Sequence, residues 1–572
     1  MADQMGVEKK GPRWAGSYDR RIDPDIALPD CSYPDILQKA FTEHAARPAA
    51  HFFGTTLTFH DLDRLSKAFA GFLVEAGCKK GDTVGICLPN VPQYLVVHTG
   101  ASRLGCITTG VSPLLTPNEL RHQLVDSGTR VLIIMDAFFE KQFIDIGKTV
   151  PTLKTVVVTN VGDMLPLVMR TVGRWMKKIP TGKVFDVPGI AVTTFKKAIA
   201  SKTPLPPVSI DPDETCLIQY TGGTTGLPKG AELTHRNIVS NIAVSVAWLG
   251  LEQGKETVLS AFPCFHLAGL ILSMGAMSSG TSQIMIPDPR DTRLICREIK
   301  LLKPTAMANV PSLYHMLLDN PAFAELDLSR CRMFISGAAP FMSEEIERFE
   351  AVVGKNKVVE VYGMTEASPL VCMNPVEGTK KTGSVGLPIP HTDVKIMDVE
   401  TGTMELSTGQ EGEITVAGPQ VMKGYRNLPG ETAKAIRVVN GERTLFTGDI
   451  GRMDDDGYMF IVDRVKDMLI VGGYKVFSRE VEEEVIRCQG VSACAIVGTK
   501  NPDRPGSELV VLFVQPTPGL SDAEKEVVKN NVLAFCHANL APYKIPKKIN
   551  LVDALPLTPI GKVDKKVLRL MA

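Results

Sequence analysis

The sequence predicts an α/β fold of several subdomains, with a large N-terminal portion followed by a small α+β unit. Three observations support this prediction. The chain has 572 residues, which is more than one hydrophobic core usually serves. Short β-branched runs alternate with helical patterns from Tyr33 to about Gly363, which is typical of βαβ units with mostly parallel strands. The pattern then changes twice, near Thr392 and again after Asp463.

The strands expected in the N-terminal portion are short runs rich in Val, Ile and Thr. Examples lie at 83–88, 131–135, 155–159, 283–286 and 333–336. The runs at 393–399 and 412–416 are separated by turns, with little room for a helix. We therefore expect a β subdomain at roughly 392–463.

The last hundred or so residues are predicted to form a compact α+β unit. A hairpin is expected around Gly472-Gly473, then a helix from Glu480, strands at 493–497 and 509–514, and a helix from Asp522. We interpret Ser478 as the N-cap of the helix before Glu480. These patterns place the boundary between an N-terminal domain, 1–463, and a C-terminal domain, 464–572.

Composition excludes several functional classes. Hydrophobic residues make up 44% of the chain and the formal net charge is zero, which argues against a disordered or nucleic-acid-binding protein. The twelve cysteines show no C-x-x-C pair, as expected of reduced thiols in the cytoplasm. Residues 1–13 are polar, so no signal peptide is expected, and no apolar run is long enough to span a bilayer.

The most informative segment is Tyr-Thr-Gly-Gly-Thr-Thr-Gly-Leu-Pro-Lys-Gly at 220–230. A strand-like run precedes it, and apolar residues at helical spacing follow it at 235–249. Such a loop offers backbone N–H groups, hydroxyls and the cation of Lys229 to a polyphosphate. Lys229 is followed by Gly230 rather than Ser or Thr, so the loop differs from that of common nucleotide triphosphatases.

Three further segments follow in order. They are Val-Tyr-Gly-Met-Thr-Glu-Ala-Ser-Pro at 361–369, Thr-Gly-Asp at 447–449 and Pro-Ile-Gly-Lys-Val at 559–563. Together with the glycine-rich loop, they resemble the signature segments of the adenylate-forming superfamily, which contains acyl-CoA synthetases, peptide-synthetase adenylation domains and luciferases. The resemblance extends from the 57–59 region to Lys562.

The resemblance implies a fold, a reaction and cofactors. The fold would be two α/β subdomains and a β subdomain joined to a small mobile C-terminal domain. In the reaction, a carboxylate attacks the α-phosphate of ATP to give acyl-AMP and pyrophosphate, and a thiol, usually that of CoA, then displaces AMP. ATP, Mg²⁺ and CoA are therefore expected. Because the first step brings two anions together, the site must supply positive charge and hydrogen-bond donors.

The resemblance also assigns catalytic residues. Lys562 would contact the carboxylate and the α-phosphate during adenylation, Glu366 would hold Mg²⁺, and His266 would lie beside the acyl carboxylate. The loop over the β- and γ-phosphates would consist of Thr221, Gly222, Gly223, Thr224, Thr225, Gly226 and Lys229.

The nucleoside would be bound by a second group of residues. Tyr362 and Gly363 would face the adenine, opposite Gly337, Ala338 and Ala339, and Thr365 would contact the α-phosphate. Asp449 would accept hydrogen bonds from both ribose hydroxyls, and Arg464 would also reach the ribose.

The C-terminal domain is expected to rotate about Lys466, which matches the hinge position of the superfamily. Gly472 and Gly473 would then line the tunnel for the pantetheine arm of CoA, where the absence of side chains leaves room. A plain hairpin turn is the alternative interpretation of these two glycines.

The sequence indicates the acid substrate less clearly than it indicates the nucleotide. Segment 161–199 looks like the corresponding segment of bacterial long-chain fatty-acid–CoA ligases, as do 374–375, 383–388 and 418–422. The segments at 336–340 and 362–366 resemble coumarate-type ligases equally well. We expect a medium- or long-chain fatty acid. One alternative is an aryl or alicyclic acid, whose ligase could also run towards ATP. Another is an acyl-AMP ligase that feeds a carrier protein.

Segment 164–178 has a second property. Leu165, Val168, Met169, Val172 and Trp175-Met176 fall on one helical stripe, and Arg170, Arg174, Lys177 and Lys178 fall on another. A basic amphipathic helix can lie on an anionic membrane surface. The alternative is a helix packed on its own domain with its cations in water.

Overall fold

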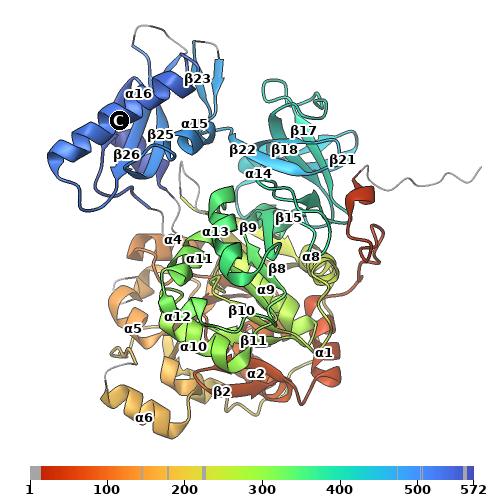
Figure 1. Ribbon diagram of the computed structural model, residues 1–572. Coiled ribbons are helices and arrows are strands. Elements are labelled where there is room, and N and C mark those ends of the chain that lie inside the picture. Colours follow the sequence, from red (N-terminus) through yellow and green to blue (C-terminus); the bar gives the residue numbers. More distant parts are fainter. Residues whose placement is uncertain are drawn as a thin grey trace, which may run out of the picture.

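Five sheets and the helices around them form the molecule (Figure 1). The computed structural model describes residues 14–143, 146–176, 179–221, 227–472, 474–502, 504, 507–557 and 563–572. Gly222 to Gly226, Gly473, Lys562 and the lysines at 177 and 178 lie outside these ranges. The expectations for those residues therefore remain predictions.

The first sheet has nine strands, in the order β16-β15-β14-β13-β12-β10-β11-β1-β2. The six strands from β14 to β1 run parallel, and antiparallel strands close both ends. The strands are β1 (Pro48–Phe52), β2 (Thr55–Thr58), β10 (Thr257–Ser260), β11 (Ser282–Met285), β12 (Ala306–Asn309), β13 (Met333–Ser336), β14 (Val358–Gly363), β15 (Leu370–Met373) and β16 (Leu387–Pro388).

The second sheet has eight strands, in the order β19-β9-β8-β4-β3-β5-β6-β7. The six strands from β8 to β7 run parallel, while β9 and β19 continue the sheet antiparallel. The strands are β3 (Thr83–Cys87), β4 (Ile107–Gly110), β5 (Thr129–Met135), β6 (Thr155–Thr159), β7 (Ala191–Thr194), β8 (Thr215–Thr221), β9 (Lys229–Thr234) and β19 (Gly424–Tyr425).

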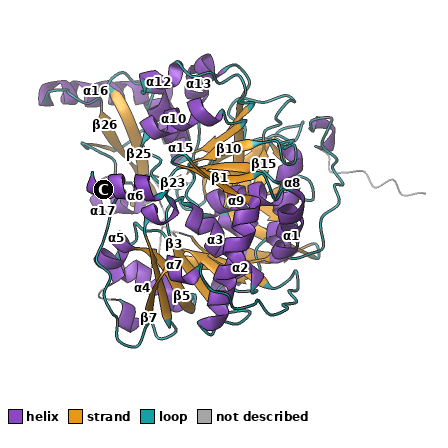
Figure 2. Ribbon diagram, turned by 90° about the horizontal axis from the view of Figure 1, so that it is seen from below, coloured by secondary structure: helices purple, strands orange, loops and turns teal. Residues whose placement is uncertain are grey.

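Helices fill the space between these two sheets and cover their outer faces (Figure 2). The inner helices are α1 (Tyr33–Glu43), α2 (Phe59–Glu75), α3 (Pro92–Arg103), α8 (His235–Trp248) and α9 (Leu267–Ser278). The largest core cluster joins their side chains to those of β1 and β3. Further helices are α4 (Pro117–Asp126), α5 (Asp136–Phe138), α6 (Leu167–Trp175), α7 (Phe195–Ala198), α10 (Thr292–Leu302), α11 (Pro311–Leu318), α12 (Pro321–Ala324) and α13 (Ser343–Val353).

A third, five-stranded sheet follows, in which β17 (Asp393–Met397), β18 (Gly412–Ala417), β21 (Glu442–Met453) and β20 (Ile436–Val439) lie in order and β22 (Met459–Arg464) pairs with β21. Helix α14 (Pro429–Ala435) precedes β20. The C-terminal unit contains a hairpin, a three-stranded sheet and three helices. Its elements are β23 (Leu469–Val471), β24 (Tyr474–Val476), α15 (Ser478–Val485), β25 (Val491–Lys500), β26 (Glu508–Pro516), α16 (Asp522–Asn539), β27 (Lys548–Leu551) and α17 (Lys565–Met571).

The predicted fold class is confirmed: two α/β sheets, a β subdomain and a small α+β C-terminal unit. One local expectation was wrong. Ser478 is not the N-cap of α15 but its first helical residue, because Asp463 reaches the start of the helix from β22. The Asp463 carboxylate accepts hydrogen bonds from both the backbone N–H and the hydroxyl of Ser478. No helix in the described ranges is long and apolar enough to cross a bilayer.

Candidate active site

The predicted site residues gather where the three large sheets meet. Thr221 and Lys229 pair at the ends of β8 and β9 in the second sheet. Residues 337–339 and 362–366 follow or end the neighbouring parallel strands β13 and β14 of the first sheet. Asp449 and Arg464 pair across β21 and β22 of the third sheet. The carboxyl ends of parallel strands are the usual place for a ligand site in an α/β protein.

A buried carboxylate joins the first sheet to the third. The Tyr362 hydroxyl donates to Asp449 Oδ2 at 2.8 Å, and Arg464 Nε lies 3.0 Å from Asp449 Oδ1. Asp449 is only 5% exposed, and its charge raises the pKa of Arg464. The backbone is fixed as well, since Thr447 Oγ accepts from the Asp449 N–H at 3.1 Å. The structure thus holds one carboxylate rigidly with two partners on separate strands.

A second buried carboxylate joins the first sheet to the second. Glu366 lies in a short 3₁₀ turn after β14, and its Oε1 accepts a hydrogen bond of 2.7 Å from the Tyr425 hydroxyl. Tyr425 belongs to β19, which pairs with β9 beyond the glycine-rich loop. Burial, followed by the nearby Glu366 charge, raises the pKa of Tyr425, so the phenol stays a donor. Among the described residues, nothing donates to Glu366 Oε2.

The Lys229 side chain already has a protein partner in this structure. Its ammonium pairs with Glu431 of α14 and lies 5.1 Å from the centre of the Tyr425 ring. Hydrogen bonds from Lys229, and next from Lys434, lower the pKa of Glu431 to about 2, so this carboxylate is ionised at any working pH. A phosphate that bound Lys229 would therefore compete with Glu431.

Small residues follow β13 at 337–339 and end β14 at 363, next to Tyr362. A Cβ on Gly337 would lie 2.6 Å from Val361 Cγ2, and one on Gly363 would lie 2.1 Å from the Pro369 carbonyl oxygen, so neither position has room for a side chain. Ala338 has a positive φ of 66° and, like Ala339, is exposed. The turn thus presents its backbone outwards at the edge of the site. Tyr362 itself is 9% exposed, so little of its ring is open in this conformation.

His266 is the residue that immediately precedes α9, and its loop is anchored from both sides. The neighbouring Phe265 carbonyl accepts from Gln219 Nε2 at 2.9 Å, which ties the loop to β8. Asn90 holds the other end, because its Oδ1 accepts from the Cys264 N–H at 2.7 Å and its Nδ2 donates to the Phe262 carbonyl at 2.9 Å.

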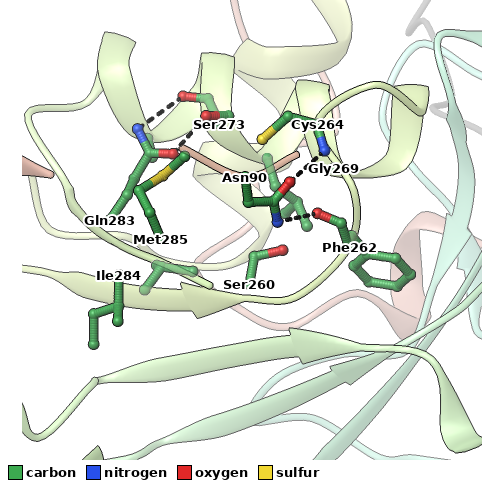
Figure 3. A pocket seen from close by; sticks show the side chains of 12 residues that line it. Asn90, Ser260, Phe262, Cys264, Gly269, Ser273, Gln283, Ile284 and Met285 are labelled. Carbon is green, nitrogen blue, oxygen red and sulfur yellow. Dashed lines mark hydrogen bonds between the residues drawn. The ribbon is translucent and has the colours of Figure 1, made fainter. Parts of the chain in front are cut away.

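A narrow pocket of about 20 Å³, room for roughly one water molecule, lies behind this loop (Figure 3). One face of α9 lines it through Gly269, Leu272, Ser273 and Ala276, and β10 and β11 form its floor. The polar side chains of Ser273 and Gln283 bond to each other at 2.5 Å. Ser260 Oγ is buried and has no partner among the described residues. The pocket therefore lies between α9 and the first sheet and has polar groups on both of these walls.

Lys466, the predicted hinge residue, lies in a turn after β22. The Asp467 and Met468 N–H groups both donate to the Arg464 carbonyl. Arg569 of α17 donates to the Lys466 carbonyl at 3.2 Å and to Asp467 Oδ1 at 2.5 Å. Gly472 is exposed, with a φ of 60°. Figure 1 shows the β23–β24 hairpin at the outer end of the C-terminal unit, away from β8 and β9.

Sequence reasoning missed Tyr425, Glu431 and Arg569. Each acts on a predicted residue from a distant part of the chain, and no motif marks any of them. Lys229 and Glu431, for example, are 202 positions apart. Among the described residues, no three His, Cys, Asp or Glu side chains cluster as a preformed metal site.

Family models identify the chain. Residues 37–426 match the AMP-binding enzyme family, and residues 480–562 match the C-terminal domain of AMP-binding enzymes. The chain belongs to the AMP-binding enzyme family. The predicted membership of the adenylate-forming superfamily is therefore confirmed.

Curated members of this family align over nearly the full length. A long-chain-fatty-acid–CoA ligase of Bacillus subtilis is 37% identical over 560 residues, which cover 97% of both chains. A ligase of the same description from Salmonella typhimurium is 35% identical, again over 97% of both. A 4-coumarate–CoA ligase of Narcissus pseudonarcissus is 31% identical and covers 90% of this chain and 87% of its own.

Solved structures of the family share the fold. The crystal structure of ATP-bound MatB from Rhodopseudomonas palustris superposes with a TM-score of 0.78 at 28% identity, covering 94% of this chain and 98% of that one. The anthranilate–CoA ligase AuaEII in complex with anthranoyl-AMP superposes with a TM-score of 0.80 over 96% of this chain, at 24% identity.

Proposed function

We propose that this AMP-binding enzyme is an ATP-dependent, AMP-forming acyl-CoA synthetase that activates medium- or long-chain fatty acids. The observation that carries the proposal is the meeting of Asp449, Glu366 and Lys229 where the three large sheets join. Tyr362 binds Asp449, and Tyr425 contacts both Glu366 and Lys229. The matching ATP-bound relative supports ATP as the nucleotide. The ligases that align over 97% of the chain support the fatty-acid substrate.

In the first half-reaction, a carboxylate oxygen of the acid forms a bond to the α-phosphorus of ATP and the bond to pyrophosphate breaks. Asp449 would accept hydrogen bonds from the ribose hydroxyls, and Arg464 would steady that carboxylate from its other side. Thr365 and Lys562 would contact the α-phosphate, and Lys229 would bind the leaving pyrophosphate once it has left Glu431. Donors placed where charge develops lower the barrier.

The residues also suit Mg²⁺ carried on the phosphates. Mg²⁺ retains several waters and takes one or two carboxylates besides phosphate oxygens. Glu366 provides one such carboxylate: its Oε1 is held by Tyr425 and its Oε2 receives no hydrogen bond from the described residues. When bound, the cation would offset the charge on the phosphates, and Tyr425 would keep the Glu366 side chain oriented.

In the second half-reaction, the sulfur of CoA attacks the acyl carbonyl and AMP leaves with the bonding electron pair. The β23–β24 hairpin, whose turn contains Gly472, lies away from β10 and β11 in this conformation (Figure 1), so the C-terminal domain would have to rotate about Lys466 before Gly472 and Gly473 could line a pantetheine tunnel. The predicted division at 463/464 falls at the end of β22, directly before the turn that contains Lys466.

The full-length matches to long-chain-fatty-acid–CoA ligases support an alkyl chain over a ring acid. The pocket lies beside α9 between Gly269 and Ala276, a span of about 10 Å at the rise of an α-helix. Its volume of about 20 Å³ is smaller than an acyl chain, so we infer that α9 and the first sheet would move apart to admit the chain. An aryl or alicyclic acid is the second candidate, because the coumarate-type relative aligns over 90% of the chain. An acyl-AMP ligase for a carrier protein would share the first half-reaction and would form no CoA thioester.

We place the activity in the cytoplasm, since all twelve cysteines are free thiols. The direction of flux is a separate question. A thioester and a phosphoanhydride are close in free energy, so synthesis of ATP from an acyl-CoA is the reverse reaction of the same residues.

The test is AMP release and thioester formation with ATP, Mg²⁺ and CoA across saturated acids from butyrate to palmitate, with benzoate and cyclohexane carboxylate. Each methylene buried in an apolar pocket contributes up to about 0.8 kcal/mol, so kcat/KM should rise up to about fourfold per carbon and then level off. Ala276→Leu, which fills the inner end of the pocket, should move this plateau to shorter acids. A maximum at the ring acids would overturn the fatty-acid proposal.

A further inference from the structure

Helix α6 exposes an apolar face that no other part of the described chain covers. Its exposed side chains are Val168 at 73%, Met169 at 43%, Val172 at 46%, Trp175 at 84% and Met176 at 48%. The sequence allowed either a helix packed on its own domain or one that faces outwards. The structure shows the second arrangement for this face.

The opposite side of α6 fixes the helix to the protein. A Cβ on Gly173 would lie 2.8 Å from Ile179 Cδ1, and one on Gly162 would lie 3.0 Å from Arg170 Cγ. Gly173 and Arg170 therefore face inwards. At 100° per residue, Trp175, Val168 and Val172 lie within a 60° arc on the other side of the helix. The apolar face thus points away from the protein.

One cation lies at the edge of this apolar face. Arg174 is exposed and 100° around the helix from Trp175, whereas Arg170 is half-buried on the inward side with its aliphatic part against Gly162. Arg174 forms no ion pair with a described residue. Asp136, which lines the same hollow as Arg174, accepts from Asn160 Nδ2. An exposed Trp beside an arginine that no described carboxylate pairs with is complementary to an anionic lipid surface.

The position of α6 fits such a contact. Figure 1 shows the helix at the end of the N-terminal portion opposite the C-terminal unit. A membrane bound there would leave the C-terminal unit free to rotate about Lys466. A soluble protein partner would have to cover a nine-residue helix with a cation at its edge, whereas an anionic bilayer matches both the apolar face and the Arg174 charge.

We propose that α6 is a peripheral membrane anchor that lies in the headgroup region of an anionic phospholipid bilayer, with Trp175, Val168 and Val172 towards the acyl chains. The inference goes beyond the proposed activity and concerns where the enzyme works: a bilayer that holds fatty acids would be the source of its substrate.

The test is co-sedimentation of the full chain with vesicles of phosphatidylglycerol and phosphatidylcholine in equal amounts, without ATP, acid or CoA. Wild type should bind, and binding should weaken at high salt. Arg174→Gln should weaken partitioning by about fivefold, since each cation near an anionic surface contributes roughly a factor of five. Val168→Ser, Val172→Ser and Trp175→Ser together should abolish binding even at low salt.

The matched control is Lys300→Gln with Leu301→Ser on α10, which also removes an exposed cation and an exposed apolar side chain, the latter 67% exposed. It should bind as wild type does. Turnover of water-soluble octanoate should be the same in all variants, so a failure of the anchor is separate from a failure of the proposed activity. Three results would overturn the proposal. They are no binding of wild type to vesicles, unchanged binding of the triple serine variant, and a wild-type dimer in light scattering that dissociates in this variant.

Discussion

The two halves of the candidate active site differ in how ready they are for a ligand. On the side of the ribose, Asp449 is buried and held by Tyr362 and Arg464, so its geometry exists before any nucleotide binds. On the side of the phosphates, Lys229 is paired with Glu431 and is about one-third exposed. One half is preorganised, and the other must first exchange a protein partner for a phosphate.

This difference has a physical reason. Under the proposed function, a fixed carboxylate would recognise the ribose diol, which is the same in ATP, acyl-AMP and AMP, so rigidity there would cost nothing during turnover. The proposed phosphate side would bind a polyanion and later release pyrophosphate. A competing carboxylate such as Glu431 keeps the Lys229 charge compensated whenever the phosphates are absent, which limits how tightly the product is held.

The largest effect is expected from the charge that the C-terminal domain would supply. Lys562→Ala should lower the adenylation rate by on the order of 10²–10³, as for other donors that act in the transition state. Thioester formation from supplied acyl-AMP should change little. Single-turnover assays of the two half-reactions measure this split, and an equal loss in both would contradict the assignment.

Removal of the preorganised carboxylate should come next. Asp449→Ala should weaken kcat/KM for ATP by on the order of 10²-fold, because charge-assisted hydrogen bonds to the ribose contribute about 1.5–3 kcal/mol. Asp449→Asn keeps the shape and loses the charge, so it should be milder. Asp456→Asn, at an exposed carboxylate, serves as the control. A loss in kcat/KM no greater than that of the control would show that this half of the site is not the ribose site.

The proposed role of the phosphate side can be tested through Glu431. Glu431→Gln should release Lys229 and lower KM for ATP by up to about fivefold, the upper range for a partly exposed ion pair. Glu442→Gln makes the same change of charge at an exposed position and should leave KM unaltered. If KM rises instead, Glu431 positions Lys229 for the phosphate rather than competing with it.

Substitutions at the predicted hinge should change the reaction rates less. Arg569→Gln removes the contacts to Asp467 and to the Lys466 carbonyl, so the ratio of the two half-reaction rates should shift by up to about fivefold. Asp467→Asn breaks the same ion pair from its other side and should shift the ratio in the same direction. A double variant whose effect equals the sum of the singles would show that the pair does not act as a unit.

The smallest effect concerns Glu360, two residues before Tyr362 on β14. Burial raises the pKa of Glu360 to about 8, although the Arg479 charge opposes this. The folded chain therefore binds a proton that the unfolded chain has lost between about pH 4.5 and pH 8, and stability falls as pH rises through that window. Glu360→Gln should remove this fall and gain a few degrees in Tm at pH 8 relative to pH 5. Glu347→Gln on α13 is the exposed control, and parallel pH curves for wild type and Glu360→Gln would refute the assignment.

The sequence predicted the fold class and several strands because those signals are local. The runs at 155–159 and 333–336 match β6 and β13 in full, since each is a short β-branched run that needs no long-range information. Motif residues such as Glu366 and Asp449 could be proposed for the same reason.

The partners of those residues could not be found in this way. Tyr425 lies on a two-residue strand, too short for any periodic pattern, and meets Glu366 only because β19 pairs with β9. The outward direction of α6 was equally hidden, because an amphipathic pattern is the same whether its apolar face is buried or exposed. Both depend on tertiary contacts between distant segments.

The most direct test of carboxylate activation at this site is exchange of labelled pyrophosphate into ATP, driven by dodecanoate without CoA. Acyl-adenylate formation predicts exchange that requires the acid and Mg²⁺, is lost in Asp449→Ala and in Lys562→Ala, and does not depend on CoA. Exchange that proceeds without an acid, or AMP formation that begins only when CoA is added, would contradict the account.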